Sequence, residues 1–92
     1  MMLNFPNSSR SFEAARNRVR FWGYDSSIEI TFFVDSGTLQ KLSVATTAAE
    51  DAVLAAFDSA VPEIHAAAAK AYKRAKHGTY AVAIMDGDFS PA

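Results

Sequence analysis

Two stretches decide the fold: residues 18–24 read Arg-Val-Arg-Phe-Trp-Gly-Tyr, and residues 28–34 read Ile-Glu-Ile-Thr-Phe-Phe-Val. In both, apolar residues recur at every second position, which is typical of β-strands with one buried face. The Asp25-Ser26-Ser27 segment between them favours a turn. The sequence therefore predicts an antiparallel hairpin of strands 18–24 and 28–34.

The alternation also suggests a register for this hairpin. If Asp25 and Ser26 form a two-residue loop, Phe21 faces Ile30 and Val19 faces Phe32 within the core. A slip of one residue would expose the whole apolar set, because successive side chains point to opposite faces. The face turned away from the core is then expected to carry Arg18, Arg20, Trp22, Tyr24, Glu29 and Phe33.

Further elements are expected on both sides of the hairpin. A strand around 10–14, turning through 15–17, precedes it, and Asp35 or Ser36 caps a short helix that carries Leu39 and Leu42. Thr47 and Glu50 have the spacing of a capping box, which marks the start of a helix. An amphipathic stripe with helical spacing follows, made of Val53, Leu54, Phe57, Val61, Ile64, Ala68 and Tyr72.

The helical region holds one ambiguity, at Pro62, and a strand and a tail follow it. Pro62 either kinks one long helix or starts a second helix at its first turn, where proline lacks no needed donor. Cations followed by Gly78 indicate the helix end. A strand over 79–85 and a frayed polar tail over 86–92 complete the reading.

The order of strands, helices and strand predicts a single α+β domain over residues 1–92. We expect two layers: a small, mainly antiparallel sheet with helices packed on one face. With 92 residues and 50% hydrophobic residues, the chain is long enough for one such core and too apolar for disorder.

Several chemistries are excluded by the residues present. Cysteine is absent, so disulfides, zinc–thiolate sites and cysteine nucleophiles are ruled out. The glycines are too far apart for a phosphate-binding loop. His65 and His77, 12 residues apart in the sequence, would lie about 18 Å apart on one helix and could not share a metal. Asp86-Gly87-Asp88 lacks the remaining ligands of a calcium loop. We expect no catalytic residues, no cofactor and no metal.

The whole pattern resembles a known family of bacterial proteins. It is carried by Phe21-Trp22-Gly23, Glu29, Phe32-Phe33-Val34, Leu39 and Leu42, followed by an alanine-rich helical region and a short terminal strand, with Asn4-Phe5-Pro6, Phe57, Ile64, Ala68 and Tyr80 also similar. The chain resembles the domain of unknown function 1488 family. The resemblance implies a small α+β protein without an established activity, and it supplies no catalytic residues.

Charge is uneven along the chain although the net charge is only −1. Arginines gather in residues 10–20, and a second basic block, residues 70–76, holds Lys70, Lys73, Arg74 and Lys76. The first hypothesis is a small interaction module that self-associates through the aromatic-bearing sheet face, with Arg18 or Arg20 of one copy meeting Glu29 of another. The alternative is a nucleic-acid accessory protein that uses both basic blocks.

The same composition bears on location and partners. The absence of cysteine and of an N-terminal signal sequence favours the cytoplasm, and no apolar run is long enough to span a membrane. We therefore expect a homo-oligomer that does not associate with membranes and does not bind nucleic acid specifically. One competing expectation is that residues 3–6 fold back over Trp22 and cover it within the same chain.

Overall fold

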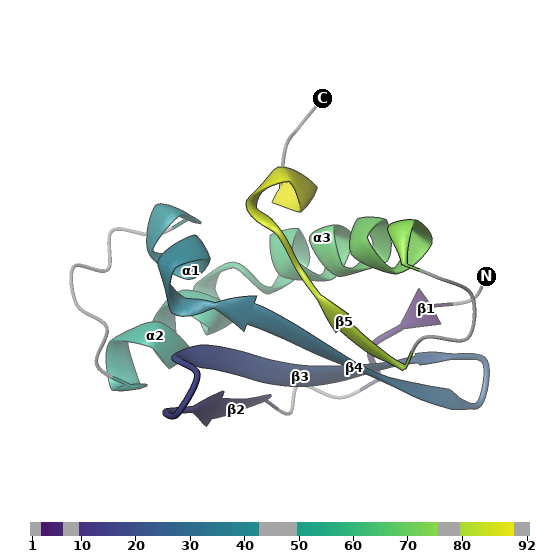
Figure 1. The fold of residues 1–92 in the computed structure, drawn as a ribbon, viewed down its shortest axis with the longest axis horizontal. Coiled ribbons are helices and arrows are strands. Elements are labelled where there is room, and N and C mark those ends of the chain that lie inside the picture. Colours follow the sequence, from purple (N-terminus) through teal and green to yellow (C-terminus); the bar gives the residue numbers. More distant parts are fainter. Residues whose placement is uncertain (1–2, 7–9, 43–49, 76–79, 90–92) are drawn as a thin grey trace.

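The computed structural model describes residues 3–6, 10–42, 50–75 and 80–89, with backbone only at 40–42. Figure 1 shows a two-layer arrangement, with the long β3–β4 hairpin below and α3 running along it above. The strands are β1 (Leu3–Asn4), β2 (Arg10–Glu13), β3 (Arg18–Asp25), β4 (Ile28–Asp35) and β5 (Ala81–Ala83). The helices are α1 (Ser36–Leu42), α2 (Glu50–Ser59), α3 (Val61–Arg74) and the short 3₁₀ helix η1 (Asp86–Phe89). The predicted α+β class is confirmed.

The five strands form one mixed sheet. The path runs β1-β3-β4-β5, and β2 pairs with β3 beside β1. All pairs are antiparallel except β4–β5, which is parallel because the chain crosses the sheet through the helices before it returns. The strand expected around 10–14 and the short helix after Asp35 are both present.

The hairpin exists as predicted, but its register is two residues away from the expected one. Phe21 pairs with Phe32 and Gly23 with Ile30, and the loop is Ser26-Ser27. Phe21 and Ile30 are therefore diagonal neighbours and not direct partners. The apolar alternation could not detect this error, because a shift of two residues leaves every side chain on the same face. Ser26, at φ 59°, adopts the left-handed backbone that a tight hairpin loop requires.

The core lies between the inner sheet face and the helices. The residues expected to fill it are at most 3% exposed, and they are Val19, Phe21, Ile30, Phe32, Phe57 and Ile64. Phe57 of α2 meets Phe21 edge-on with ring centroids 5.1 Å apart. The alternating apolar residues of the strands and the apolar stripe of the helices therefore pack together in one layer, as predicted.

Pro62 begins a separate helix and does not kink a long one. The proline lies in the first turn of α3, and Ala60 is the N-cap. The helix ends at Arg74, because Ala75 turns into extended backbone at ψ 157°. This end comes earlier than Gly78 suggests. Thr47, Lys76, His77, Gly78 and the side chain of Leu42 lie outside the described residues.

The C-terminal region differs from its prediction. Strand β5 covers only 81–83, within the expected 79–85. Residues 86–89, expected to fray with the rest of 86–92, form η1 instead, and Asp88 is buried. Arg74 binds the Asp88 carboxylate at 2.5 Å, and the same carboxylate accepts the backbone N–H of Met85 at 2.8 Å. These bonds hold η1 on α3; residues 90–92 are outside the described part.

Candidate functional site

The candidate site is the sheet face turned away from the helices, which we call the outer face. The register places the outer-face side chains of the hairpin in alternating positions: Arg18, Arg20, Trp22 and Tyr24 on β3, and Glu29, Thr31, Phe33 and Asp35 on β4. Glu13 of β2 lies beside Arg18, and Ala83 of β5 lies beside Phe33. All six residues expected on this face are therefore brought together by the fold.

Each arginine of the outer face lies against an aromatic ring. The guanidinium carbon of Arg18 is 3.7 Å from the centre of the Phe33 ring, and that of Arg20 is 5.2 Å from the Trp22 ring. Such contacts combine cation–π attraction with apolar packing of the arginine stem. Trp22 and Phe33 are consequently half-buried within one chain. The outer face is an ordered layer of cations on rings and not a bare apolar patch.

Glu13 belongs to this layer, and the sequence reasoning missed it. Its carboxylate accepts a hydrogen bond from Arg18 Nε at 2.5 Å and lies 3.9 Å from Arg20. The Arg18 hydrogen bond holds the pKa of Glu13 below its ordinary value. The sequence did contain a signal for this contact. Glu13 is the one acid of the first basic block, and pairing the expected strand 10–14 with the hairpin brings it beside the arginines.

Glu29 lies at the other end of the outer face. It is exposed, and one of its carboxylate oxygens accepts a hydrogen bond from the Tyr24 hydroxyl at 3.2 Å. The Glu29 charge raises the pKa of Tyr24, because a second negative charge beside the first is unfavourable. The outer face thus carries two guanidinium groups together with Glu13 and Asp35 toward one end, and the exposed Glu29 carboxylate toward the other.

Residues 3–6 do fold back on the sheet, although they do not cover Trp22 as the competing expectation had it. β1 pairs with Tyr24 and Asp25 at the end of β3. The Phe5 ring packs on the inner face, where it lies 6.0 Å from Phe21 and 3.9 Å from His65, measured between ring centroids. The described part of this segment therefore leaves the Trp22 side of the sheet open.

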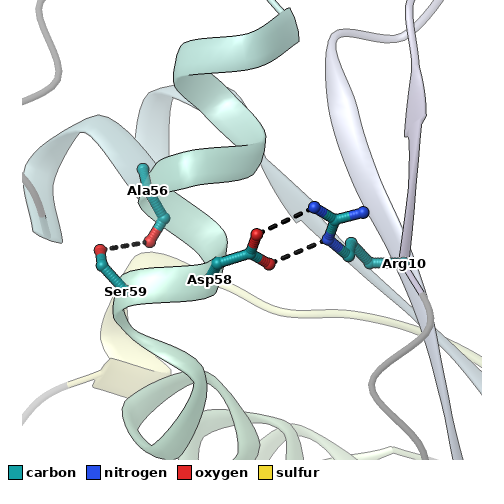
Figure 2. A network of polar contacts seen from close by, with 4 residues as sticks. All are labelled: Arg10, Ala56, Asp58 and Ser59. Carbon is teal, nitrogen blue, oxygen red and sulfur yellow. Dashed lines mark hydrogen bonds and ion pairs between the residues drawn. The ribbon is translucent and has the colours of Figure 1, made fainter.

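The arginines of the first basic block are largely paired with acids. Arg10 makes a two-pronged contact with Asp58 of α2, with both N–O distances at 2.9 Å (Figure 2). This hydrogen bonding lowers the pKa of Asp58. Figure 2 also shows the Ser59 hydroxyl bonded to the Ala56 carbonyl at the end of the same helix. Arg10 thus links the sheet edge to α2. Its guanidinium group is occupied by Asp58 and is not available to bind a phosphate.

The second basic block is in the other layer of the fold. Lys70, Lys73 and Arg74 belong to α3, and Arg74 is engaged by Asp88. Lys73 is exposed, whereas Lys76 is outside the described residues. The outer face and this helix end are therefore separated by the core and do not form one continuous basic surface.

Metal and membrane sites can be checked only for the described residues. Within those residues no three side chains of the histidine, cysteine, aspartate or glutamate type come together as a metal site would require. None of the described helices has the length and apolarity needed to cross a bilayer.

The fold and this face define a class: small α+β proteins with a five-stranded mixed sheet, helices on one face, and an arginine–aromatic layer on the other. The chain belongs to the family described as "Protein of unknown function (DUF1488)", which it matches over residues 3–83. Comparison with curated proteins and with solved structures finds no match for this chain.

Proposed function

We propose that this protein is a small interaction module that self-associates through its outer face. The observation that carries the proposal is the layer formed by Arg18 on Phe33 and Arg20 on Trp22. Arginine and tryptophan are the residue types that contribute most binding energy at the centres of protein interfaces. Stacking also pre-orders the guanidinium groups, so less side-chain entropy is lost when a partner binds.

Charge on the outer face supports a second copy as the partner. A two-fold contact uses one surface twice, so the surface must complement itself. Here Arg20 and Glu29 lie on either side of Trp22 along the hairpin, which allows Arg20 of each copy to meet Glu29 of the other. The Arg20 side chain is 41% exposed and its Nη1 is 3.9 Å from Glu13, so the outer end of this guanidinium is accessible to a second carboxylate.

A non-catalytic role in the cytoplasm is part of this proposal. In the described part of the chain, His65 is stacked on an aromatic ring and makes no hydrogen bond to a carboxylate or hydroxyl, so nothing there resembles a nucleophile–base pair. The absence of cysteine fits a reducing compartment.

Sedimentation velocity at tens of micromolar tests the proposal. We expect the wild type to be a dimer, and Trp22→Ala to shift it to monomer. Arg20→Glu and Glu29→Arg should each weaken the dimer, and the double variant should recover it, because the pair is restored with reversed sign. Lys73→Glu on α3 is the matched charge control.

Three results would contradict the proposal. They are a monomeric wild type at tens of micromolar, a dimer that is indifferent to Trp22→Ala, and a double charge-swap variant no stronger than its single parents. Far-ultraviolet circular dichroism and urea unfolding of each variant separate loss of association from loss of fold.

A further inference from the structure

A short segment at the start of the chain fills a recess in the core with one aromatic ring. Residues 3–6, which we call the strap, pair with β3 at only two positions. The Phe5 ring lies flat on the imidazole of His65, with centroids 3.9 Å apart and an interplanar angle of 10°. It also lies 5.7 Å from the Phe32 ring. The strap is therefore held by this short pairing and by the packing of Leu3 and Phe5 on the core.

Gly23 forms the floor of this recess. A Cβ atom at Gly23 would lie 2.6 Å and 2.8 Å from two carbons of the Phe5 ring, and 3.1 Å from the backbone oxygen of Asn4. Carbon atoms do not approach so closely, so any side chain at this position displaces the ring. The absence of a side chain at Gly23 is what allows Phe5 to reach His65 while β1 stays paired with β3.

The surroundings of His65 are apolar. One turn away on α3 lie Val61, Pro62, Ala68 and Ala69, and the strap residues Leu3, Asn4, Phe5 and Pro6 carry no titratable side chain. Glu63 and Lys70, on α3 itself, are exposed. The charged residues Arg18, Arg20, Glu29 and Asp35 belong to the outer face. Asp25 on β3 accepts a hydrogen bond from Tyr72, and Asp58 on α2 is paired with Arg10.

An imidazolium ion is therefore unfavourable under the docked strap. The Phe5 ring face would attract the cation, but no described carboxylate contributes to its stability and Phe5 excludes water from one face of the imidazole. The lost hydration outweighs the attraction to the ring. Burial accordingly lowers the pKa of His65. Undocking of Phe5 would return that face to water, where the charged form is stable.

We propose that the strap is proton-sensitive: neutral His65 holds Phe5 in the recess over Gly23, and protonation of His65 releases it. The two equilibria are linked, so each must shift the other by the same factor. One pKa unit of difference between the docked and undocked states corresponds to a tenfold change in strap docking, or about 1.4 kcal/mol. This inference is independent of the outer face, because strap and outer face use opposite sides of the sheet.

Nuclear magnetic resonance titration of His65 tests the linkage in the intact protein. We expect the wild-type pKa of His65 to be below 6.5. Phe5→Ala should raise it, and so should Gly23→Ala, which changes neither ring but leaves no room for Phe5. A rise of at least half a unit, about threefold in docking, is the expected size.

Hydrogen exchange of the β1 amides provides a second readout. Protection factors, which correct for the pH dependence of intrinsic exchange, should fall between pH 7 and pH 5 in the wild type. They should stay level in His65→Phe, which keeps an aromatic ring without a titrating group. An unchanged His65 pKa in both Gly23→Ala and Phe5→Ala overturns the proposal. So does a wild-type protection profile as flat as that of His65→Phe.

Discussion

Tyr72 on α3 donates a hydrogen bond to Asp25 at the end of β3, with the two oxygens 2.6 Å apart. The two residues are 47 positions apart in the sequence. The bond fastens the last turns of the long helix to the hairpin beside its loop. It lies on the inner side of the sheet, near the site where β1 also joins β3.

Removal of this bond should weaken the domain. Tyr72→Phe keeps the ring, which packs edge-on against Phe32, and deletes only the donor. We expect the free energy of unfolding in urea to fall by about 1 kcal/mol near pH 7. Tyr24→Phe, which removes only an exposed hydrogen bond to Glu29, is the control and should cost less. Equal unfolding midpoints for Tyr72→Phe and wild type would contradict the assignment.

The same bond predicts a change at alkaline pH. The hydrogen bond to Asp25 raises the pKa of Tyr72 above 10 in the folded state. A raised pKa adds stability that is fully present below the unfolded value of about 10 and is lost as the pH rises through the folded value. Urea unfolding between pH 9 and pH 11 should therefore show a steeper loss for the wild type than for Tyr72→Phe.

Phe57 should be among the most costly side chains to truncate. It is 3% exposed and meets Phe21 edge-on across the two layers. Phe57→Ala should lower the free energy of unfolding by roughly 3–5 kcal/mol, a large share of a small domain's stability. Tyr80→Ala, which truncates a 59% exposed ring, should change it by less than about 0.5 kcal/mol. Comparable urea midpoints for the two variants would show that the core is misassigned.

The Arg10–Asp58 pair should contribute little, and its contribution should depend on salt. Both side chains are partly in water, so a double-mutant cycle with Arg10→Met and Asp58→Asn should give a coupling of about 0.2–1 kcal/mol. Raising the salt to 1 M should reduce it. Because the pair lowers the pKa of Asp58, its contribution is present above pH 4 and should vanish as the pH falls below that.

Nucleic-acid binding should be absent at physiological salt. Arg10 and Arg18 are already paired with carboxylates, and the second basic block is in the other layer of the fold. Fluorescence anisotropy with labelled single-stranded and double-stranded oligonucleotides should show no submicromolar affinity. If such affinity appears and falls with salt, Arg18→Ala combined with Arg20→Ala should flatten the salt slope by up to about two units, and the alternative function would gain support.

The linear sequence determined which residues share a face of each strand and helix. Alternation places Phe21 and Trp22 on opposite sides of one strand, and helical spacing collects Phe57 and Ile64 on one stripe. These assignments follow from the pitch of strand and helix alone, so they do not depend on what the elements meet. The layers, the core and the part of the outer face that the hairpin supplies could be predicted for this reason.

Only the tertiary structure decided which residues meet. Register was determined only to within two positions, because Phe32 and Ile30 are equally apolar and the Ser26-Ser27 loop makes the choice. Glu13 belongs to the arginine layer through strand pairing, and Asp88 meets Arg74 because η1 packs on α3. Phe5 reached His65 across the bare backbone of Gly23. Each of these contacts depends on a distance between segments far apart in the chain, and a periodic pattern carries no information about such distances.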